Sequence, residues 1–296
     1  MLRIMLAAIA SVFMIAGALA QDGARAYFLL PEGTNIASLT AYGLHTEVGA
    51  TRIDTGVLTA SYRRTIDIGG NAGAILIGLP IGGLSGVIDT GFGVVPVNNS
   101  LALGDLFVGG ELGLFGSPAL GPMEYAQHKP GFRAGVAAKL FLPTGDYSST
   151  RLTNLGQNRW SLQASVPLSY VLADSMIDPT ITTFEIVPSV HIFGDNPNAF
   201  GSVSSQDPLW QVEGHVTHTF SPMVWAALDA YAETGGRTTA GGVETAAAHQ
   251  SVALGATLGL VLSPQLALRL SYVEQVYSSV SNSARRSVEL TAAFMF

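Results

Sequence analysis

The sequence predicts an all-β protein: a transmembrane antiparallel up-and-down β-barrel of about 12 strands, after a cleaved signal peptide. Three observations predict it: an export signal at the N-terminus, an apolar composition without a membrane-spanning helix, and apolar residues that alternate with polar ones. The expected organisation is a signal peptide over residues 1–20 and an outer-membrane β-barrel over residues 21–296.

The export signal occupies residues 1–20. Arg3 precedes an apolar run that ends in Ala18, Leu19 and Ala20, the small-x-small pattern of a signal-peptide cleavage site. A membrane anchor is the alternative, but one short apolar run before this pattern favours cleavage, with Gln21 as the first mature residue. Loss of Arg3 moves the formal net charge from −7 to about −8, which argues against a nucleic-acid partner.

The composition is unusual for a soluble secreted domain. Charged residues make up 12% of the chain and hydrophobic residues 48%, whereas soluble domains carry about 25% charged residues. No apolar run of ~18 residues follows the signal peptide, so no transmembrane helix is expected. The chain has no cysteine, which excludes disulfides and thiolate metal sites. An exported apolar chain of this kind indicates a barrel of the bacterial outer membrane, because a closed barrel also pairs every backbone group within lipid.

Twelve segments, each of roughly 9 to 15 residues, have the length of strands that cross a bilayer. The alternation is clear in the segment 265–277, where Leu266, Leu268 and Leu270 share one face and Arg269 and Ser271 the other. An even number of strands places both termini on the periplasmic side. The first and third segments alternate least. The predicted strands are residues 36–44, 55–68, 72–81, 101–114, 131–142, 159–172, 182–193, 209–220, 223–234, 250–262, 265–277 and 285–296.

The connections between these strands alternate in length, as expected for short periplasmic turns and longer external loops. The short junctions are residues 69–71, 221–222 and 263–264. The longer ones are residues 82–100, 143–158, 194–208, 235–249 and 278–284, whereas the loop at residues 45–54 is only moderate in length. The junction at 115–130 should be a short turn but is too long for one. A soluble β-protein, the main alternative, has no reason to produce this alternation.

If the apolar face of each strand contacts lipid, the polar face lines the lumen. A charge on the lipid side costs about 2 to 4 kcal/mol at the bilayer midplane, whereas a wet lumen tolerates it. The lining could be a polar pore wall or an ion-pair network that fills the barrel, since 12 strands lie between filled barrels of about 8 and open ones of about 16. The lumen-lining candidates carry both signs of charge: Arg63, Asp67, Asp105, Glu111, Arg133, Lys139, Glu185, His191, Glu213, His215, Asp229, Tyr231, Glu233, Arg269 and Glu289.

Signals for enzyme chemistry are poor, so no catalytic residue, cofactor or metal site is expected. His215 and His218 are three residues apart, which places them on opposite faces of a strand. Ser85 stands one place late for a nucleophile elbow among the glycines of residues 82–86. The glycine pairs at 235–236 and 241–242 precede no helix and are expected in a flexible external loop. The segment 21–34 is too short for a plug domain.

The most specific pattern lies where one predicted strand ends and the next begins. Pro143 cannot donate to a strand ladder, Gly145 can adopt a positive φ, and Asp146 can accept backbone hydrogen bonds. These properties favour folding of an external loop over direct contact with substrate as the role of the pattern. Its residues are Pro143, Thr144, Gly145, Asp146 and Tyr147, followed by Asn154, Gly156, Asn158 and Trp160.

This pattern, within the stretch from Phe132 to Asp174, resembles the central signature of the outer-membrane family described as "Putative MetA-pathway of phenol degradation". The upstream run from Leu103 to Leu106 is similar to a Gly-Asp strand start of that family. The resemblance covers residues 101–196 and implies an outer-membrane channel or transporter that passes small, hydrophobic or aromatic compounds by passive diffusion. The alternatives are a structural or surface-binding barrel without transport and a membrane-embedded hydrolase.

The last predicted strand has a wholly apolar face, formed by Val288, Leu290, Ala292, Phe294 and Phe296. A strand with apolar residues at alternate positions that ends in an aromatic residue resembles the signal read by the outer-membrane assembly machinery, which assigns that role to Phe294 and Phe296. The expected partners are therefore outer-membrane lipid, the barrel-assembly machinery and a small-molecule solute.

Overall fold

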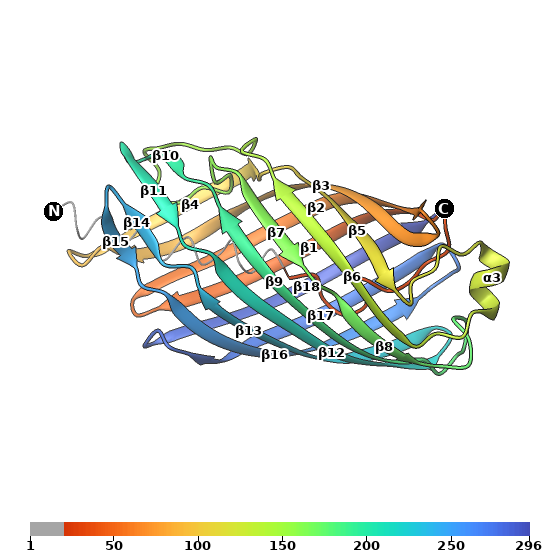
Figure 1. The fold of residues 1–296 in the computed structure, drawn as a ribbon. Helices are drawn as coiled ribbons and strands as arrows, with labels where there is room; N and C mark the ends of the chain where they lie inside the picture. The colour runs from red at the N-terminus through yellow and green to blue at the C-terminus, as the bar shows by residue number, and fades with distance from the viewer. Residues whose placement is uncertain (1–20) are drawn as a thin grey trace.

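The chain forms a closed antiparallel barrel with 12 strand positions, which confirms the predicted fold class (Figure 1). The computed structural model describes residues 21–296, and the predicted signal peptide lies outside the described residues. The barrel sheet contains 14 strands because two positions each hold two short strands. β4 and β5 both pair with β3, and β7 and β8 both pair with β6 and β9. The first and last strands, β1 and β18, pair along their whole length.

The bounds of the barrel strands show long strands on the N-terminal side. They are β1 (Asn35–Val48), β2 (Thr51–Ile68), β3 (Asn71–Asp89), β4 (Val94–Leu103), β5 (Phe107–Phe115), β6 (Phe132–Phe141), β7 (Ser161–Ser165), β8 (Leu168–Leu172), β9 (Thr182–Phe193), β12 (Leu209–Ser221), β13 (Val224–Gly235), β16 (His249–Val261), β17 (Leu266–Ser278) and β18 (Ser283–Met295).

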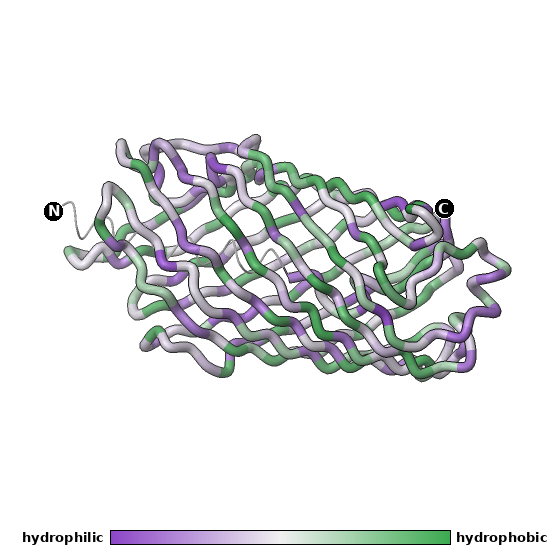
Figure 2. The backbone as a smooth tube through the Cα atoms, in the orientation of Figure 1, coloured by the Kyte–Doolittle hydropathy of each residue, from purple (hydrophilic) through white to green (hydrophobic). Residues whose placement is uncertain are grey.

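Hydrophobic and polar residues alternate along the strands (Figure 2), and the exposed side chains show that the outer wall of the barrel is apolar and the inner wall polar. Leu39, Leu58, Ile75, Leu270 and Leu290 each leave between 44% and 53% of their surface exposed on the outside. Their sequence neighbours point inward, because successive side chains of a strand point to opposite faces. An apolar belt of this size around a closed barrel is the surface that a bilayer covers.

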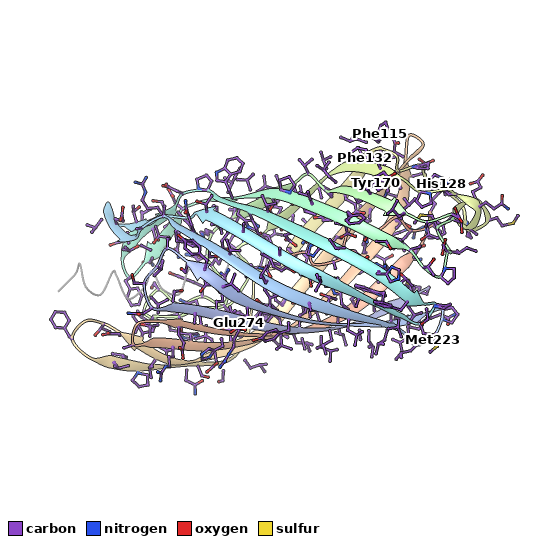
Figure 3. All side chains as sticks on the ribbon, turned by 90° about the horizontal axis from the view of Figure 1, so that it is seen from below. Phe115, His128, Phe132, Tyr170, Met223 and Glu274 are labelled. Atoms are coloured by element: carbon purple, nitrogen blue, oxygen red, sulfur yellow. The ribbon has the colours of Figure 1, made fainter. Side chains whose placement is uncertain are left out.

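Aromatic residues mark both edges of the apolar belt, as expected at the two membrane interfaces. Phe115, Phe132 and Tyr170 lie together outside the barrel at the end that holds α3 (Pro122–Gln127), as Figure 3 shows. The rings of Phe115 and Phe132 lie 5.8 Å apart, centroid to centroid. Trp160 and Trp210 begin strand positions at the opposite end and are 55% and 59% exposed. The α3 end carries the turns at residues 69–70 and 222–223, whereas the opposite end carries the long connections at residues 142–160 and 194–208, so the α3 end is the periplasmic end.

Three predicted connections differ in the structure. The loop expected at 82–100 is a hairpin, because β3 continues to Asp89 and β4 begins at Val94. Glycines and asparagines in these two strands weaken the alternation that would have revealed them. Similarly, β1 and β2 are joined by a tight turn at Gly49 and Ala50. The long junction at 115–130 contains the short helix α3, and within residues 21–296 no helix has the length and apolar character to cross a membrane.

A second sheet of four strands lies beyond the external rim, at the left in Figure 1. Gly241 and Gly242 have φ values of 56° and 76° and form the turn of its second hairpin, since only glycine adopts such values without strain. The expectation of a flexible loop at these glycines was wrong. The strands are β10 (Asn196–Ala199), β11 (Ser202–Gln206), β14 (Thr238–Ala240) and β15 (Val243–Ala246).

Candidate functional site

The segment 21–34 runs inside the lumen before it joins β1. The backbone N–H groups of Asp22 and Gly23 donate to the two carboxylate oxygens of Glu213, both at 3.1 Å. The N–H of Arg25 donates to Oε2 of Glu185 at 2.9 Å. The sequence-based expectation that this segment is too short for a plug domain missed its role, because a short extended segment without a fold of its own can still fill a lumen.

Side chains of the segment add further anchors on several strands. Asp22 forms an ion pair with Lys139 of β6 and accepts a hydrogen bond from the hydroxyl of Tyr27 at 2.6 Å. The guanidinium of Arg25 donates to Oγ1 of Thr217 at 3.0 Å and lies 4.5 Å from the ring of Trp225. These contacts come from β6, β12 and β13, so they hold the segment across the lumen.

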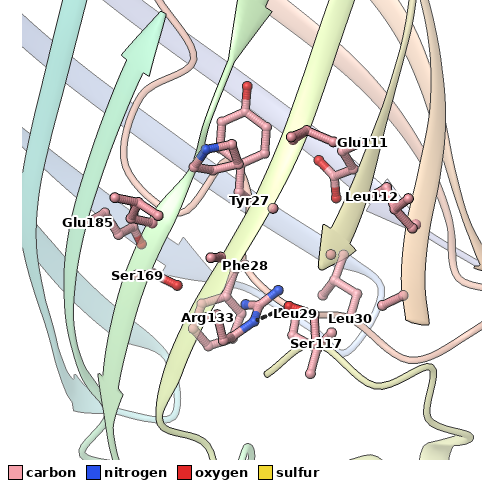
Figure 4. A pocket seen from close by; sticks show the side chains of 18 of the residues that line it. Tyr27, Phe28, Leu29, Leu30, Glu111, Leu112, Ser117, Arg133, Ser169 and Glu185 are labelled. Atoms are coloured by element: carbon pink, nitrogen blue, oxygen red, sulfur yellow. Dashed lines mark hydrogen bonds between the residues drawn. The ribbon is translucent and has the colours of Figure 1, made fainter. Parts of the chain in front are cut away.

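Two arginines of the wall bind carbonyl groups of the segment. Arg269 Nη1 donates to the carbonyl oxygens of Asp22 and Ala24 at 3.4 and 3.3 Å, and Arg63 Nη1 donates to Ala26 at 3.1 Å. Ala24 is only 1% exposed. Figure 4 shows Tyr27, Phe28, Leu29 and Leu30 of the segment between the walls, beside Glu111, Arg133 and Glu185. The segment was not recognisable from strand periodicity, although its charged and aromatic side chains precede the first strand directly.

The remaining inward charges pair with one another along the wall. Arg63 forms an ion pair with Glu111, and Arg269 Nη2 lies 2.6 Å from Glu289 Oε1. His215 lies 2.7 Å from Asp229. Of the two interiors that the sequence left open, the described residues therefore show an ion-pair network, with the N-terminal segment built into it.

A second group of inward charges lies nearer the external end. Arg285 and His249 both contact Oε1 of Glu233, at 2.7 and 3.4 Å. The hydroxyl of Ser251 donates to the same oxygen at 2.8 Å. Because Glu233 is bound to three cationic or polar partners on β16 and β18, this cluster ties β13, β16 and β18 together.

The lumen-lining candidates differ in where they lie and in how far they are buried. Asp67 does not face the lumen. It is exposed at the turn after β2, where its carboxylate accepts a hydrogen bond from the N–H of Gly70 at 2.6 Å. Asp105 lies in the gap between β4 and β5. Arg133 donates through Nε to Ser117 at 3.1 Å near the periplasmic end (Figure 4). The inward residues with only 1% to 8% exposure are Glu185, His191, Glu213, His215, Asp229, Tyr231 and Glu233, and those with 18% to 23% side-chain exposure are Arg63, Glu111, Lys139, Arg269 and Glu289.

The external loop after β6 folds back onto the gap between β4 and β5. The carboxylate of Asp105 accepts the N–H of Gly145 at 2.9 Å and the N–H of Gln157 at 2.8 Å. In the opposite direction, Asp146 accepts the N–H of Leu103 at 2.7 Å. These bonds replace the strand ladder that is interrupted at residues 104–106, so the two aspartates fasten the loop to the wall.

The glycines of this loop are required for close backbone approach. A Cβ on Gly145 would lie 2.7 Å from the carbonyl carbon of Gly104 and 2.7 Å from Cα of Gly156. Gly145 is not among the glycines with positive φ, so the predicted reason for a glycine there was wrong. The contact is between backbones, which no other residue type permits at this distance.

The other residues of the loop pattern also bind the loop itself or its neighbours. Asn154 Oδ1 accepts the N–H of Ser148 at 2.8 Å, and Asn158 Nδ2 donates to Asn196 at 2.9 Å. The hydroxyl of Tyr147 donates to the carbonyl of Asn198 at 3.0 Å. The pattern therefore folds the external loop and connects it to the hairpin β10–β11.

Cavities lie beside the wall formed by β2, β3, β5, β6 and β9, and the volumes given for them include space that is open to solvent. The lowest, of about 680 Å³, lies beside Phe28 and Arg133. The middle one, about 440 Å³, is lined by Asp22 and Lys139. The upper one, about 620 Å³, is lined by phenylalanines that include Phe141, the next inward residue of β6 above Lys139. The lumen is thus partly filled, with empty space along one side.

Residues 32–286 match the protein family described as "Putative MetA-pathway of phenol degradation". The chain belongs to this family. A closed 12-strand barrel with an apolar belt places it in the bacterial outer membrane. No curated protein matches the sequence.

Several solved structures are similar to this chain. An outer membrane channel from Pseudomonas putida is 17% identical with a TM-score of 0.70, over 90% of this chain and 97% of that chain. The translocator domain of the autotransporter NalP from Neisseria meningitidis is 11% identical with a TM-score of 0.48, over 96% and 93% of the two chains. The toluene transporter TodX from Pseudomonas putida is 9% identical with a TM-score of 0.41, over 90% and 89%. The likeness to the first of these shows a shared fold.

Proposed function

We propose that the protein is a passive channel of the outer membrane that passes small hydrophobic or aromatic compounds. The observation that carries the proposal is the row of cavities along one side of the lumen, from the phenylalanine-lined cavity below the external loop to the cavity at the periplasmic end. These cavities leave space for small apolar solutes on this side, whereas the paired charges and the N-terminal segment occupy other parts of the lumen.

The family and its structural neighbour support the same function. The chain belongs to a family described by a phenol-degradation pathway, and the similar barrel from Pseudomonas putida is an outer membrane channel. Passive diffusion is the simplest transport that this architecture permits, because the described residues form a barrel, a short luminal segment and a small external sheet. We expect no catalysis, and no group of three or more metal-ligating side chains occurs within residues 21–296.

Uptake by intact cells tests the channel function. A Gram-negative host that expresses the protein should accumulate radiolabelled toluene and phenol several-fold faster than the same host with an empty vector. The outer membrane without a channel retards such compounds, so added barrels should raise the initial rate. Equal rates in the two strains, with the folded barrel present in the outer membrane, would count against a channel. A surface-binding barrel without transport would give that result.

The proposed partners include the barrel-assembly machinery, which would read the end of β18. Asn35 and Phe296 exchange two backbone hydrogen bonds, at 3.0 and 2.9 Å, where the barrel closes. Deletion of Phe296 should leave export intact and lower the amount of assembled barrel several-fold, measured as the heat-modifiable band on a semi-native gel. Phe296→Tyr, which keeps an aromatic ring, is the matched control and should assemble normally. A wild-type level after the deletion would refute the assembly role.

A further inference from the structure

The upper cavity of the lumen has an aromatic lining. Phe107 of β5 and Phe141 of β6 are register partners, and their ring centroids lie 5.5 Å apart. Phe193 of β9 lines the same cavity, which we call the aromatic chamber. Three rings from three strands thus line one cavity, and aromatic rings prefer other rings at such separations.

The chamber is bounded at both ends by structures described above. The external loop contributes Leu155, so the fastened loop covers the chamber on the outside. Below the aromatic chamber, the ion pair of Asp22 and Lys139 separates the chamber from the middle cavity, because Lys139 is the next inward residue of β6 after Phe141. On one side, the guanidinium of Arg159 lies 4.6 Å from the ring of Phe193, and burial lowers the pKa of Arg159 to about 10.

One polar atom of the lining has no partner. His191 of β9 lines the chamber, is only 2% exposed, and its Nε2 makes no hydrogen bond with any residue of the range 21–296. Buried polar atoms are nearly always paired in folded proteins, and an unpaired one lowers stability. By contrast, the carboxylate of Asp105, which also lines the chamber, accepts hydrogen bonds from two backbone N–H groups.

We propose that the aromatic chamber binds a monocyclic aromatic compound that carries a hydroxyl group. The ring lies among Phe107, Phe141 and Phe193, and the hydroxyl forms a hydrogen bond with Nε2 of His191. A hydroxyl both donates and accepts, so it pairs with Nε2 in either tautomer of the imidazole. An aromatic hydrocarbon would fill the same space but leave Nε2 unpaired. The inference rests on the proposed channel function and names a specificity-determining residue for it.

Equilibrium binding to the purified, folded, full-length protein tests the chamber, with phenol, toluene and cyclohexanol as probes. In the wild-type protein, saturation-transfer NMR titrations should show phenol bound at least about fivefold more tightly than either of the other two. Toluene lacks the hydroxyl and cyclohexanol lacks the aromatic ring, so each loses one of the two interactions. Equal affinities for phenol and toluene would overturn the proposal without any variant.

Variants then assign the two interactions to residues. His191→Phe should lower the affinity for phenol about tenfold, because it removes the hydrogen-bonding atom. The affinity for toluene should stay within about twofold of the wild-type value, because the variant keeps a ring. His191→Gln, which restores a polar group, should recover part of the phenol affinity. Phe141→Ala should lower the affinity for both phenol and toluene. The matched control is His218→Phe on β12, since His218 bonds Thr182 and does not line the chamber.

The possible outcomes distinguish failure of the proposed binding chamber from failure of the proposed channel function. If His191→Phe weakens phenol and toluene by the same factor, or neither, the assignment to His191 is wrong even when cells take up both compounds. If binding follows the expected pattern but expression of the protein does not speed uptake, the chamber stands and the channel function fails. A heat-modifiable band must accompany each variant, so that loss of folding is recognised.

Discussion

Deletion of residues 23–30 is expected to open the lumen to small polar solutes. The deletion removes Arg25, Tyr27 and Leu29, and with them the contacts to Glu185, Thr217 and Tyr125. A barrel of 12 strands is wider than the filled barrels of about 8 strands, so water should enter the space that the segment leaves. Liposome swelling with a small sugar and single-channel conductance should both rise by about tenfold or more, since steric occlusion is the main barrier in a narrow pore.

A point variant provides a graded comparison for this deletion. Glu213→Gln keeps the shape of the side chain but removes the charge that accepts the N–H groups of Asp22 and Gly23. Charge-assisted hydrogen bonds are about twice as strong as neutral ones, so the segment should be held less firmly and conductance should rise by a smaller factor. Wild-type conductance in a folded deletion variant would show that the segment does not limit passage.

Asp105→Ala is expected to lower the free energy of unfolding by about 3 kcal/mol, because two hydrogen bonds to a buried charge each contribute about 1.5 to 3 kcal/mol. The lost bonds are those to Gly145 and Gln157, which fasten the external loop to the wall. Urea unfolding in lipid vesicles, followed by tryptophan fluorescence, measures the change. The loop should also become accessible to proteases.

Glu244→Ala is the matched control for Asp105→Ala. Glu244 is an exposed acid of the external hairpin β14–β15, and exposed substitutions usually change stability by less than about 0.5 kcal/mol. If the two variants unfold at the same urea concentration, the loop is held by contacts other than those of Asp105.

Much of the barrel could be predicted from alternation alone. The strand expected at 182–193 has those bounds in β9, and the faces expected for residues 265–277 are those of β17, with Leu270 outside and Arg269 inside. The period of two is a local property of the backbone, and lipid outside a wet lumen imposes it on every spanning strand. The strands β3 and β4 were underestimated because their glycine-rich ends carry little of this signal.

The candidate site was less predictable than the wall. His191 was identified as an inward residue, but the sequence could not indicate that its Nε2 is unpaired or that Phe107, Phe141 and Phe193 surround the same space. Such a chamber depends on the register between strands that are far apart in the chain. Register follows from pairing across the whole sheet, and one residue of slip would exchange inner and outer faces.

The sequence by itself determined the spanning barrel and which side chains face lipid, since these follow from composition and from a period of two along single strands. Only the tertiary structure decided what the lumen contains. The path of residues 21–34 and the attachment of the external loop through Asp105 depend on hydrogen bonds between segments remote in sequence. Such bonds join segments that only the folded barrel brings together, and no local pattern in the chain records their partners.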